Sequence, residues 1–322
     1  MKDFDAEVLR VDYEFAASSH LWTANIGQGG PSFRIENKEI ADFQPTSVWM
    51  RRWGFPIYPS SFDEVSTMLA FSELSSLLSG LPHLDDCFWL NRPDREKIAS
   101  NKVLQLTTAQ SIGFVVPPTV ITNSALEALA FSKNVGRTIF KAVSASQVPL
   151  RRFNQAAFNA LSPTERSKFD FGFKYETEYM YTRELTEDMT GSLYETLRWS
   201  PAIFQKRIEK RSDIRVTVVG RKIFACSIDS QSREDTKTDF RFMNVSGLLP
   251  HVAVELGDRV NDMVFSLMDR LGLHFGCIDF VEDTKGDLVF LEINPSGQWL
   301  WIEQLTGIAI SKAIALALVE AD

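Results

Sequence analysis

The chain has 322 residues, of which 44% are hydrophobic and 24% charged, and its formal net charge is −8. This composition is typical of a folded globular protein, and the acidic balance disfavours a general affinity for nucleic acid, which is bound through basic surface. No apolar run reaches the roughly 18 residues of a membrane span, and the first residues lack the apolar core of a signal peptide. We therefore expect a cytoplasmic protein with neither a nucleic-acid nor a membrane partner.

The cysteine pattern also indicates a cytosolic protein, and the histidine pattern indicates no zinc site. Cys87, Cys226 and Cys277 form no C-x-x-C pair, which favours reduced thiols in a cytosolic protein. The four histidines lack the spacing of metal ligands, so a zinc site is not expected.

The first third of the chain predicts a small lobe followed by a helix. Residues 7–11 and 32–35 have the composition of short strands, and residues 62–78 have apolar residues at helical spacing. Residues 94–111 predict another helix, with Asp94 able to cap it.

The middle of the chain alternates strand and helix patterns before it loses periodicity. Residues 115–121 predict a strand, Thr122 or Asn123 could cap a helix that ends at Ser132, and residues 138–143 predict a second strand. Residues 151–196 are the least periodic part and are rich in acidic and aromatic side chains.

The last third combines strands with amphipathic helices. Residues 202–208, 214–219 and 222–228 predict strands, and residues 257–271 and 310–318 predict helices with one apolar face. This mixture predicts an α+β or α/β protein built in layers. We divide it into three parts: an N-terminal lobe (1–95), a central lobe (96–203) and a C-terminal lobe (204–322).

Three oxygen-bearing side chains lie on a predicted hairpin near the C-terminus. Glu292 and Asn294 are two residues apart and therefore share one face of their strand. The length of the turn decides where Asp279 lies relative to Glu292. A two-residue turn at Lys285 and Gly286 places Asp279 directly opposite Glu292, and a four-residue loop over 283–286 places it diagonally on the same face. A three-residue loop places Asp279 on the other face. Convergent oxygens of this kind suit Mg²⁺, although an exposed polar face of an ordinary strand pair would show the same spacing.

Cationic residues precede and follow the predicted strands. Lys102 and Lys141 could each reach a phosphate as compact charges, although a lysine at a strand end is also commonly solvated. Arg215 alternates with valines on its strand and, like Arg241, could bind an anion bidentately; a surface ion pair is the simpler alternative. The chain has no GxxxxGK[ST] and no GxGxxG motif, so a Walker or Rossmann nucleotide site is not supported.

The remaining candidate functional residues favour phosphoryl transfer. The apolar strand around residues 204–208 could offer backbone groups to an adenine edge, and Asp213 could accept hydrogen bonds from a ribose. No arrangement of histidine with serine or cysteine predicts a nucleophilic hydrolase. Cations beside an acidic metal site are what phosphoryl transfer requires.

The order of these segments resembles the ATP-grasp superfamily. The resemblance rests on NRPDREKIASNK, PPTVIT, IFKAVSAS, IFQKRI, DIRVTVVG, GCIDF and LEINPSGQWLWIE, and covers residues 90–322. Within the superfamily, TDFRF and EINPSGQWLWIE resemble the microviridin-type (graspetide-forming) ligases that macrocyclise ribosomal precursor peptides. The phosphate loop departs from the pattern, because residues 144–146 contain no glycine, and the N-terminal pre-ATP-grasp lobe is reduced or truncated.

This resemblance implies a fold that clamps ATP between the central and C-terminal lobes. It implies that side-chain carboxylates of Asp or Glu in a precursor peptide become acyl phosphates, which Thr, Ser or Lys side chains displace to form ester or amide rings. A homodimer is also expected. The implied contacts are Lys102 and Lys141 with phosphate; Gln205, Lys206 and Ile208 with adenine; Asp213 with ribose; Asp279, Glu292 and Asn294 with Mg²⁺; and Arg215 and Arg241 with the transferred phosphate or acyl phosphate.

The acidic stretch within the central lobe suggests where the precursor's leader would dock. Glu184, Glu187 and Asp188 lie in a region that also contains Glu176, Glu178, Glu195, Tyr175, Tyr179 and Tyr181. Negative charge beside aromatic rings would suit a leader with arginine and large apolar residues, whereas a solvated acidic loop would have the same composition.

Two other functions remain possible at this stage. One is a different ATP-grasp ligase, which adds amino acids to a C-terminus or joins small metabolites. The other is an ATP-binding regulatory protein without ligase activity. The presence of Lys141, Arg215, Asp279, Glu292 and Asn294 together favours catalysis.

Overall fold

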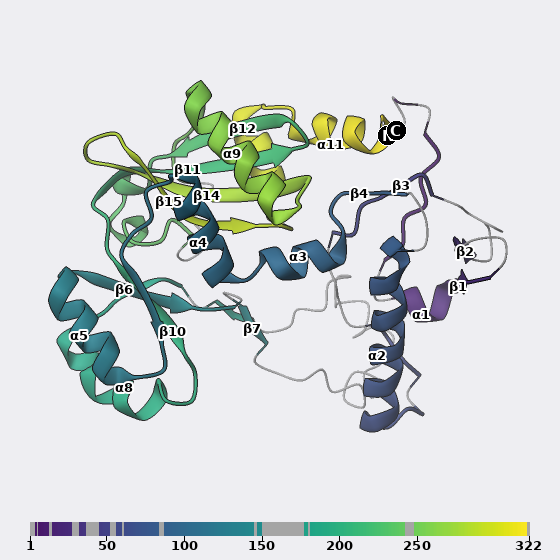
Figure 1. The fold of residues 1–322 in the computed structure, drawn as a ribbon, viewed down its shortest axis with the longest axis horizontal. Coiled ribbons are helices and arrows are strands. Elements are labelled where there is room, and N and C mark those ends of the chain that lie inside the picture. Colours follow the sequence, from purple (N-terminus) through teal and green to yellow (C-terminus); the bar gives the residue numbers. More distant parts are fainter. Residues whose placement is uncertain are drawn as a thin grey trace. The chain divides into compact units, whose positions relative to one another are not determined.

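The computed structural model describes residues 4, 6–12, 15–27, 32–36, 45–51, 56–59, 61–83, 87–144, 147–149, 177–179, 181–241 and 248–320 (Figure 1). The chain divides into two compact units. The first comprises Met1–Lys97, Arg152–Lys174 and Lys312–Asp322, and the second comprises Ile98–Arg151 and Tyr175–Ser311. Every nucleotide, metal and phosphate contact predicted above belongs to the second unit. No helix in the described ranges has the length and apolar character that a membrane crossing needs.

The first unit contains short strand pairs and one long helix. Its elements are α1 (Ala16–Ser19), β1 (Leu21–Asn25), β2 (Ser32–Glu36), β3 (Ser47–Val48), α2 (Glu64–Gly80), η3 (Leu81–His83), β4 (Phe88–Trp89) and most of α3 (Pro93–Ala99). β1 pairs with β2 antiparallel and β3 with β4 in parallel. Asp63 caps α2 by accepting the Ser66 N–H at 2.7 Å. The predicted strand at 32–35 and helix at 62–78 are confirmed. The strand predicted at 7–11 is wrong, because residues 6–12 pair with no described strand.

The helix predicted over 94–111 is two helices. α3 ends at Ala99, and α4 spans Lys102–Ile112. Asn101 has an extended backbone, and its side chain accepts the Leu104 N–H at 3.1 Å, so it caps a new helix where the prediction had a continuous one. The break places Lys102 at the first position of α4.

One sheet of the second unit has four strands, and two helices pack against it. The strand order is β5 (Thr119–Thr122), β10 (Ala202–Lys206), β6 (Thr138–Ala142) and β9 (Arg183–Glu184), and α5 (Ala125–Val135) and α8 (Thr190–Thr196) pack on it through Ala128, Leu193 and Phe204. The cap predicted at Thr122 or Asn123 is wrong, because Ser124 is the residue that accepts the Glu127 N–H. β7 (Gln147–Pro149) and β8 (Thr177–Tyr179) form a separate pair, and η4 (Glu187–Met189) precedes α8.

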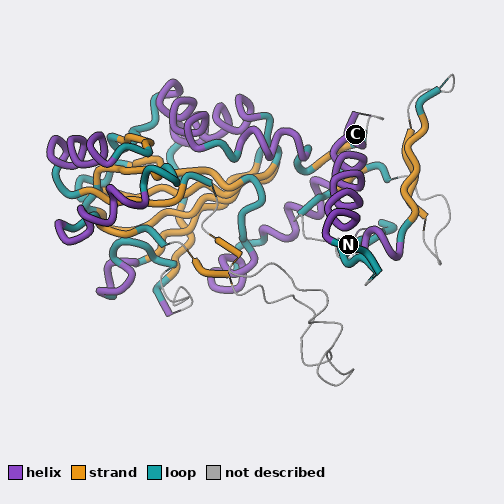
Figure 2. Tube along the Cα trace, turned by 90° about the horizontal axis from the view of Figure 1, so that it is seen from below, coloured by secondary structure: helices purple, strands orange, loops and turns teal. Residues whose placement is uncertain are grey.

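The other large sheet of the second unit has five antiparallel strands. Its order is β13 (His251–Val254), β12 (Lys222–Ile228), β11 (Lys210–Val219), β14 (Phe275–Asp283) and β15 (Leu288–Asn294). Helices α4 and α9 (Asp258–Leu271) cover one face of this sheet, and their apolar side chains share its core (Figures 1 and 2). The remaining elements are η5 (Ser230–Ser232), η6 (Glu234–Thr236), α10 (Leu300–Thr306) and α11 (Ile310–Val319).

The register of the β14–β15 hairpin decides where the acidic side chains lie. Glu282 pairs with Leu288 and Phe280 with Phe290, so Thr284, Lys285 and Gly286 form a three-residue turn. That turn alone would place Asp279 opposite Leu291, on the wrong face. A bulge at Leu291 shifts the pairing by one residue, and Asp279 therefore pairs with Glu292. The turn and the bulge together give the arrangement that the two-residue turn would have given.

Candidate active site

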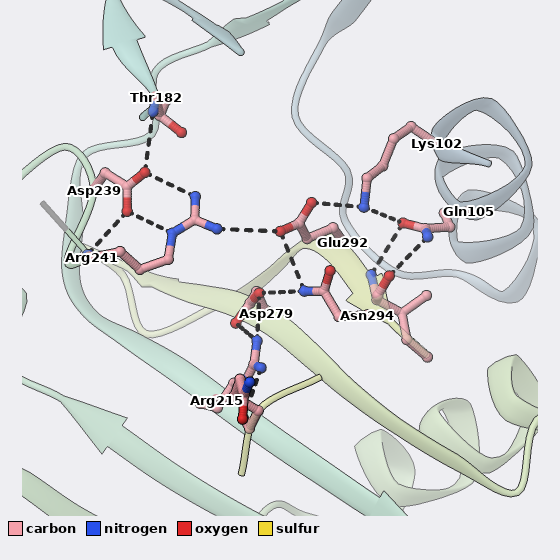
Figure 3. Close-up of polar contacts among 11 residues, drawn as sticks. Lys102, Gln105, Thr182, Arg215, Asp239, Arg241, Asp279, Glu292 and Asn294 are labelled. Atoms are coloured by element: carbon pink, nitrogen blue, oxygen red, sulfur yellow. Dashed lines mark hydrogen bonds and ion pairs between the residues drawn. The ribbon is translucent and has the colours of Figure 1, made fainter. Parts of the chain in front are cut away.

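The three predicted metal ligands converge on one face of the hairpin (Figure 3). The Asn294 side-chain amide lies 3.2 Å from Asp279 Oδ2 and 3.4 Å from Glu292 Oε1. The side chains of Asp279 and Glu292 are 14% and 15% exposed. These groups are thus neighbours in a mostly buried site, as the sequence spacing suggests, and not an exposed polar strand face.

Cations hold both carboxylates. Arg215 Nη1 donates to Asp279 Oδ1 and Oδ2 at 2.7 and 2.8 Å, and its Nη2 donates to the Gln298 carbonyl at 3.1 Å. Lys102 Nζ lies 2.8 Å from Glu292 Oε2. Both cations are therefore engaged with the acidic pair, and they balance charge that would otherwise be buried without compensation.

The local charges shift several pKa values. Burial favours the neutral form of Glu292, but the adjacent Lys102 and Lys141 outweigh this effect and hold the pKa of Glu292 below its usual value. Burial also opposes the charge of Arg215, yet Asp279 raises the pKa of this guanidinium. Burial lowers the pKa of Lys141, and the neighbouring charges of Lys102 and Arg241 add to this effect. Glu292 and Arg215 are therefore charged at neutral pH.

Arg241 is directed toward Glu292 by a neighbouring acid. Asp239 Oδ1 accepts the Arg241 backbone N–H and Nε–H at 3.0 and 2.9 Å, and Oδ2 accepts Nη2–H at 2.8 Å. Arg241 Nη1 then lies 4.0 Å from Glu292 Oε1. Asp239 Oδ2 also accepts the backbone N–H of Thr182 at 3.1 Å, which ties the chain before β9 to this loop (Figure 3).

A cavity of about 350 Å³ opens beside these groups. It is lined by residues of α4, β6, β10, β11 and the hairpin, and by the loop that carries Arg241. Of the sequence-predicted residues, those on its wall are Lys102, Lys141, Gln205, Lys206, Ile208, Asp213, Arg241, Asp279, Glu292 and Asn294. Arg215 contacts Asp279 from behind and is not among the described residues that line the cavity.

Gln205 lies on the cavity wall and has a buried acceptor. Its side chain is 1% exposed, and its Nε2 donates to Thr119 Oγ1 at 2.9 Å. The Thr119 hydroxyl uses its one proton on the Pro117 carbonyl at 2.7 Å, so it can only accept from Gln205. The amide orientation is thereby fixed, and Oε1 is a buried acceptor with no hydrogen-bond partner among the described residues.

The other predicted nucleotide contacts have different surroundings. Lys206 has an exposed side chain, whereas its backbone N–H donates to the Pro118 carbonyl at 2.9 Å. Asp213 is 6% exposed and accepts Lys210 Nζ at 2.6 Å. Burial raises the pKa of Asp213 despite this lysine. An Asp213 contact with ribose would therefore have to form beside the Lys210 ion pair.

The proposed leader-binding acids separate into two groups. Glu184 accepts Arg137 Nε–H and Nη2–H at 2.7 and 2.9 Å and Arg207 Nη1–H at 2.7 Å, so its carboxylate holds β9 to the residue before β6 and the residue after β10. Glu187 and Asp188 are exposed on η4. Tyr175 and Glu176 lie outside the described residues, as do the side chains of Glu178 and Tyr179 and residues 145–146 of the phosphate loop.

Four site residues were missed by the sequence analysis. Gln105, Asp239 and Lys210 each bind a predicted residue or its strand, and Lys237 lies on the cavity wall. Asp239 could have been found, since it shares the TDFRF segment with Arg241. Gln105 gives no local signal, because its partner Ile293 is 188 residues away.

The donor set fits Mg²⁺. It offers two carboxylates and one amide oxygen, and Mg²⁺ takes its remaining ligands from water and phosphate. The described residues contain no group of three or more His, Cys, Asp and Glu arranged for a metal. Asn294 donates its N–H groups to both carboxylates where a cation would lie between them, so rotation of this amide would turn its oxygen toward the ion.

Comparison with known structures was made against this geometry. A RiPP-associated ATP-grasp ligase of Chryseobacterium gregarium, solved with ADP and a leader and core peptide, is 25% identical, with a TM-score of 0.83 over 100% of this chain and 91% of that chain. The macrocyclase MdnB of Microcystis aeruginosa MRC is 26% identical, with a TM-score of 0.72 over 99% and 92%. The macrocyclase MdnC of the same organism, bound with precursor peptide MdnA, is 22% identical, with a TM-score of 0.76 over 100% and 93%.

The chain has the ATP-grasp fold. The resemblance to peptide-modifying ATP-grasp ligases that the motifs suggested is confirmed, and it extends over the whole chain rather than over residues 90–322 alone. No protein-family model matches the sequence, and no curated protein matches it.

Proposed function

We propose that this chain is an ATP-dependent ligase that macrocyclises a ribosomal precursor peptide. It activates Asp or Glu side chains of the peptide as acyl phosphates and joins them to Thr, Ser or Lys side chains. The observation that carries this proposal is the cavity whose wall combines Lys102, Lys141 and Arg241 with the acidic pair of Asp279 and Glu292. The similarity to the Chryseobacterium gregarium ligase, solved with ADP, leader and core, supports the peptide substrate.

The first step transfers the terminal phosphoryl group of ATP to a peptide carboxylate. A bond from phosphorus to the ADP oxygen breaks and a bond to the carboxylate oxygen forms, which turns an unreactive carboxylate into one with a leaving group. Asp279, Glu292 and Asn294 would hold Mg²⁺, which supplies charge neutralisation across phosphate oxygens. Lys102 and Lys141, which both lie on the cavity wall, would contact the phosphates, and Gln205 and Ile208 of the same wall would contact adenine.

The second step forms the ring. A hydroxyl or amine of the same peptide attacks the acyl carbon, loses its proton and displaces phosphate, so each ring removes the elements of one water. Arg241, with a 42% exposed side chain, is the arginine available to the acyl phosphate, whereas Arg215 orients Asp279 through its hydrogen bonds. The protein thus contributes positioning and charge more than covalent chemistry.

The experiment pairs the purified chain with peptides encoded by short reading frames beside its gene. With ATP and Mg²⁺, mass spectrometry should show the loss of one or more waters from a peptide rich in Thr, Ser or Lys and in Asp or Glu. ADP release should depend on that peptide. Asp279→Asn should abolish both signals, and Asp269→Asn, an exposed acid of α9, should leave them unchanged.

Two outcomes would separate this proposal from its alternatives. Added residues in place of lost water would indicate an amino-acid-adding ligase. Nucleotide binding without peptide-dependent ADP release would indicate a regulatory protein.

We also propose that the protein is a cytoplasmic homodimer. Light scattering coupled to size-exclusion chromatography would test the dimer.

A further inference from the structure

The side-chain amide of Gln105, in the second unit, is fully buried, and all its donors and acceptors are hydrogen-bonded. Gln105 on α4 is 0% exposed. Its Nε2 donates to the carbonyls of Ala99 and Ile293 at 2.6 and 2.8 Å, and its Oε1 accepts the Ile293 N–H and Lys102 Nζ, each at 3.2 Å. A primary amide has two donors and two acceptor sites, so none is left over. Exchanging its oxygen and nitrogen would oppose like groups at all four contacts, and the partners therefore fix its orientation.

This amide takes the place of a neighbouring strand at the edge of the sheet. β15 is the last strand of its sheet, and beyond its pairing with β14 it has one isolated bridge in the described structure, from Val289 to Val115 at the far end from Ile293. Gln105 satisfies both the N–H and the C=O of Ile293, as a backbone partner would. Ile293 lies between Glu292 and Asn294, so the contact holds the two residues whose side chains face Asp279.

The same amide also holds the cation of the site. Lys102 Nζ bonds both Gln105 Oε1 and Glu292 Oε2, at 3.2 and 2.8 Å (Figure 3). Lys102 and Gln105 are one helical turn apart on α4, and the spacing directs both toward β15. Gln105 therefore fixes the position of β15, which carries Glu292 and Asn294, and also the position of Lys102, which neutralises Glu292.

We propose that Gln105 is a positioning residue that holds β15 and Lys102 in the geometry in which Glu292 and Asn294 share a divalent ion with Asp279. This inference rests on the proposed function, since it assumes that the acids bind Mg²⁺ with the nucleotide. It assigns Gln105 no contact with substrate.

The test is calorimetric titration of Gln105→Leu with ADP, with and without Mg²⁺. Leucine fills nearly the same space without hydrogen bonds, so the backbone of residues 292–294 loses its anchor. We expect ADP affinity without Mg²⁺ to stay within about threefold of the wild type, whereas the gain in affinity on adding Mg²⁺ should fall by about tenfold or more. Amide hydrogen exchange at residues 292–294 should be faster in the variant, and this readout needs neither metal nor turnover.

Two controls separate positioning from general loss of stability. Met268→Ala removes a buried side chain of the same core and should lower the melting temperature without changing the Mg²⁺-dependent gain. Gln110→Leu changes an exposed glutamine of the same helix and should change nothing. If Gln105→Leu does not fold, Gln105→Glu keeps the acceptor for Ile293 and Lys102 but loses both donors, and the same loss of Mg²⁺-dependent gain is expected.

The proposal would be overturned if the Gln105 variants kept the wild-type Mg²⁺-dependent gain, or if they matched Met268→Ala in both the titration and the exchange rates. A wild-type chain that binds no ADP even with Mg²⁺ would instead defeat the proposed function. The two failures are therefore distinguishable.

Discussion

Replacing Gln205 with leucine should change nucleotide preference more than stability. Gln205 Oε1 is a buried acceptor without a partner in the described structure, and its Nε2 donates to Thr119. Adenine carries an amino donor at its 6 position, whereas guanine carries a carbonyl oxygen there. We therefore expect Oε1 to accept from adenine and to oppose guanine.

The magnitude follows from these contacts. A neutral hydrogen bond contributes about 0.5–1.5 kcal/mol net, and the upper end applies because the free protein already bears the desolvation of this acceptor. Gln205→Leu should thus weaken ATP binding by roughly tenfold. The free energy of unfolding should change by less than about 1 kcal/mol, because the lost bond to Thr119 is offset by removal of an unpaired buried acceptor.

The assay is calorimetric titration with a non-hydrolysable ATP analogue and with its GTP counterpart, beside urea denaturation of the free protein. Gln110→Leu provides the exposed control. The ratio of GTP to ATP affinity should rise in Gln205→Leu. Equal weakening of both nucleotides, together with a large loss of stability, would show that Gln205 only supports the fold.

Two further predictions concern other parts of the second unit. Gly297→Ala would place a Cβ 2.4 Å from Cys277 Cβ and 2.7 Å from Cys277 Sγ, so we expect the free energy of unfolding in urea to fall by at least about 2 kcal/mol. The control is Gly257→Ala, whose added Cβ meets nothing within 4 Å. Equal stability of the two variants would refute the steric argument. Reversing both Glu187 and Asp188 to lysine should weaken leader-peptide binding by roughly tenfold in calorimetry if this exposed pair docks a basic leader; unchanged affinity would remove this surface from consideration.

Periodicity and motif order predicted most of the architecture. The strand at 222–228 and the helix at 257–271 agree with β12 and α9 within one residue, because one buried face sets each pattern. The helix at 94–111 was predicted as continuous, since a cap such as Asn101 competes only weakly with helical spacing on either side. The strand at 7–11 was wrong because a strand depends on its partner as much as on its own residues.

Side-chain partners were much less predictable than elements. The sequence indicates that Asp279, Glu292 and Asn294 carry oxygen ligands, yet it leaves three possible turns, and the bulge at Leu291 has no signature of its own. Glu184 has the same sequence context as Glu187, but only Glu184 meets Arg137 and Arg207, which come from other segments. Contacts of this kind depend on tertiary structure, which local patterns do not encode.

The irregular hairpin has an evolutionary consequence. A shorter version with a two-residue turn and straight strands would pair the same acids, so the turn and Leu291 can lose a residue together without cost to the metal ligands. Loss of Leu291 alone, or of one turn residue alone, would also leave Asp279 paired with Glu292, because this pair lies beyond both features. Homologous hairpins of different length can therefore hold equivalent acids, and an alignment through this region should match the two acids first and place any gap between them.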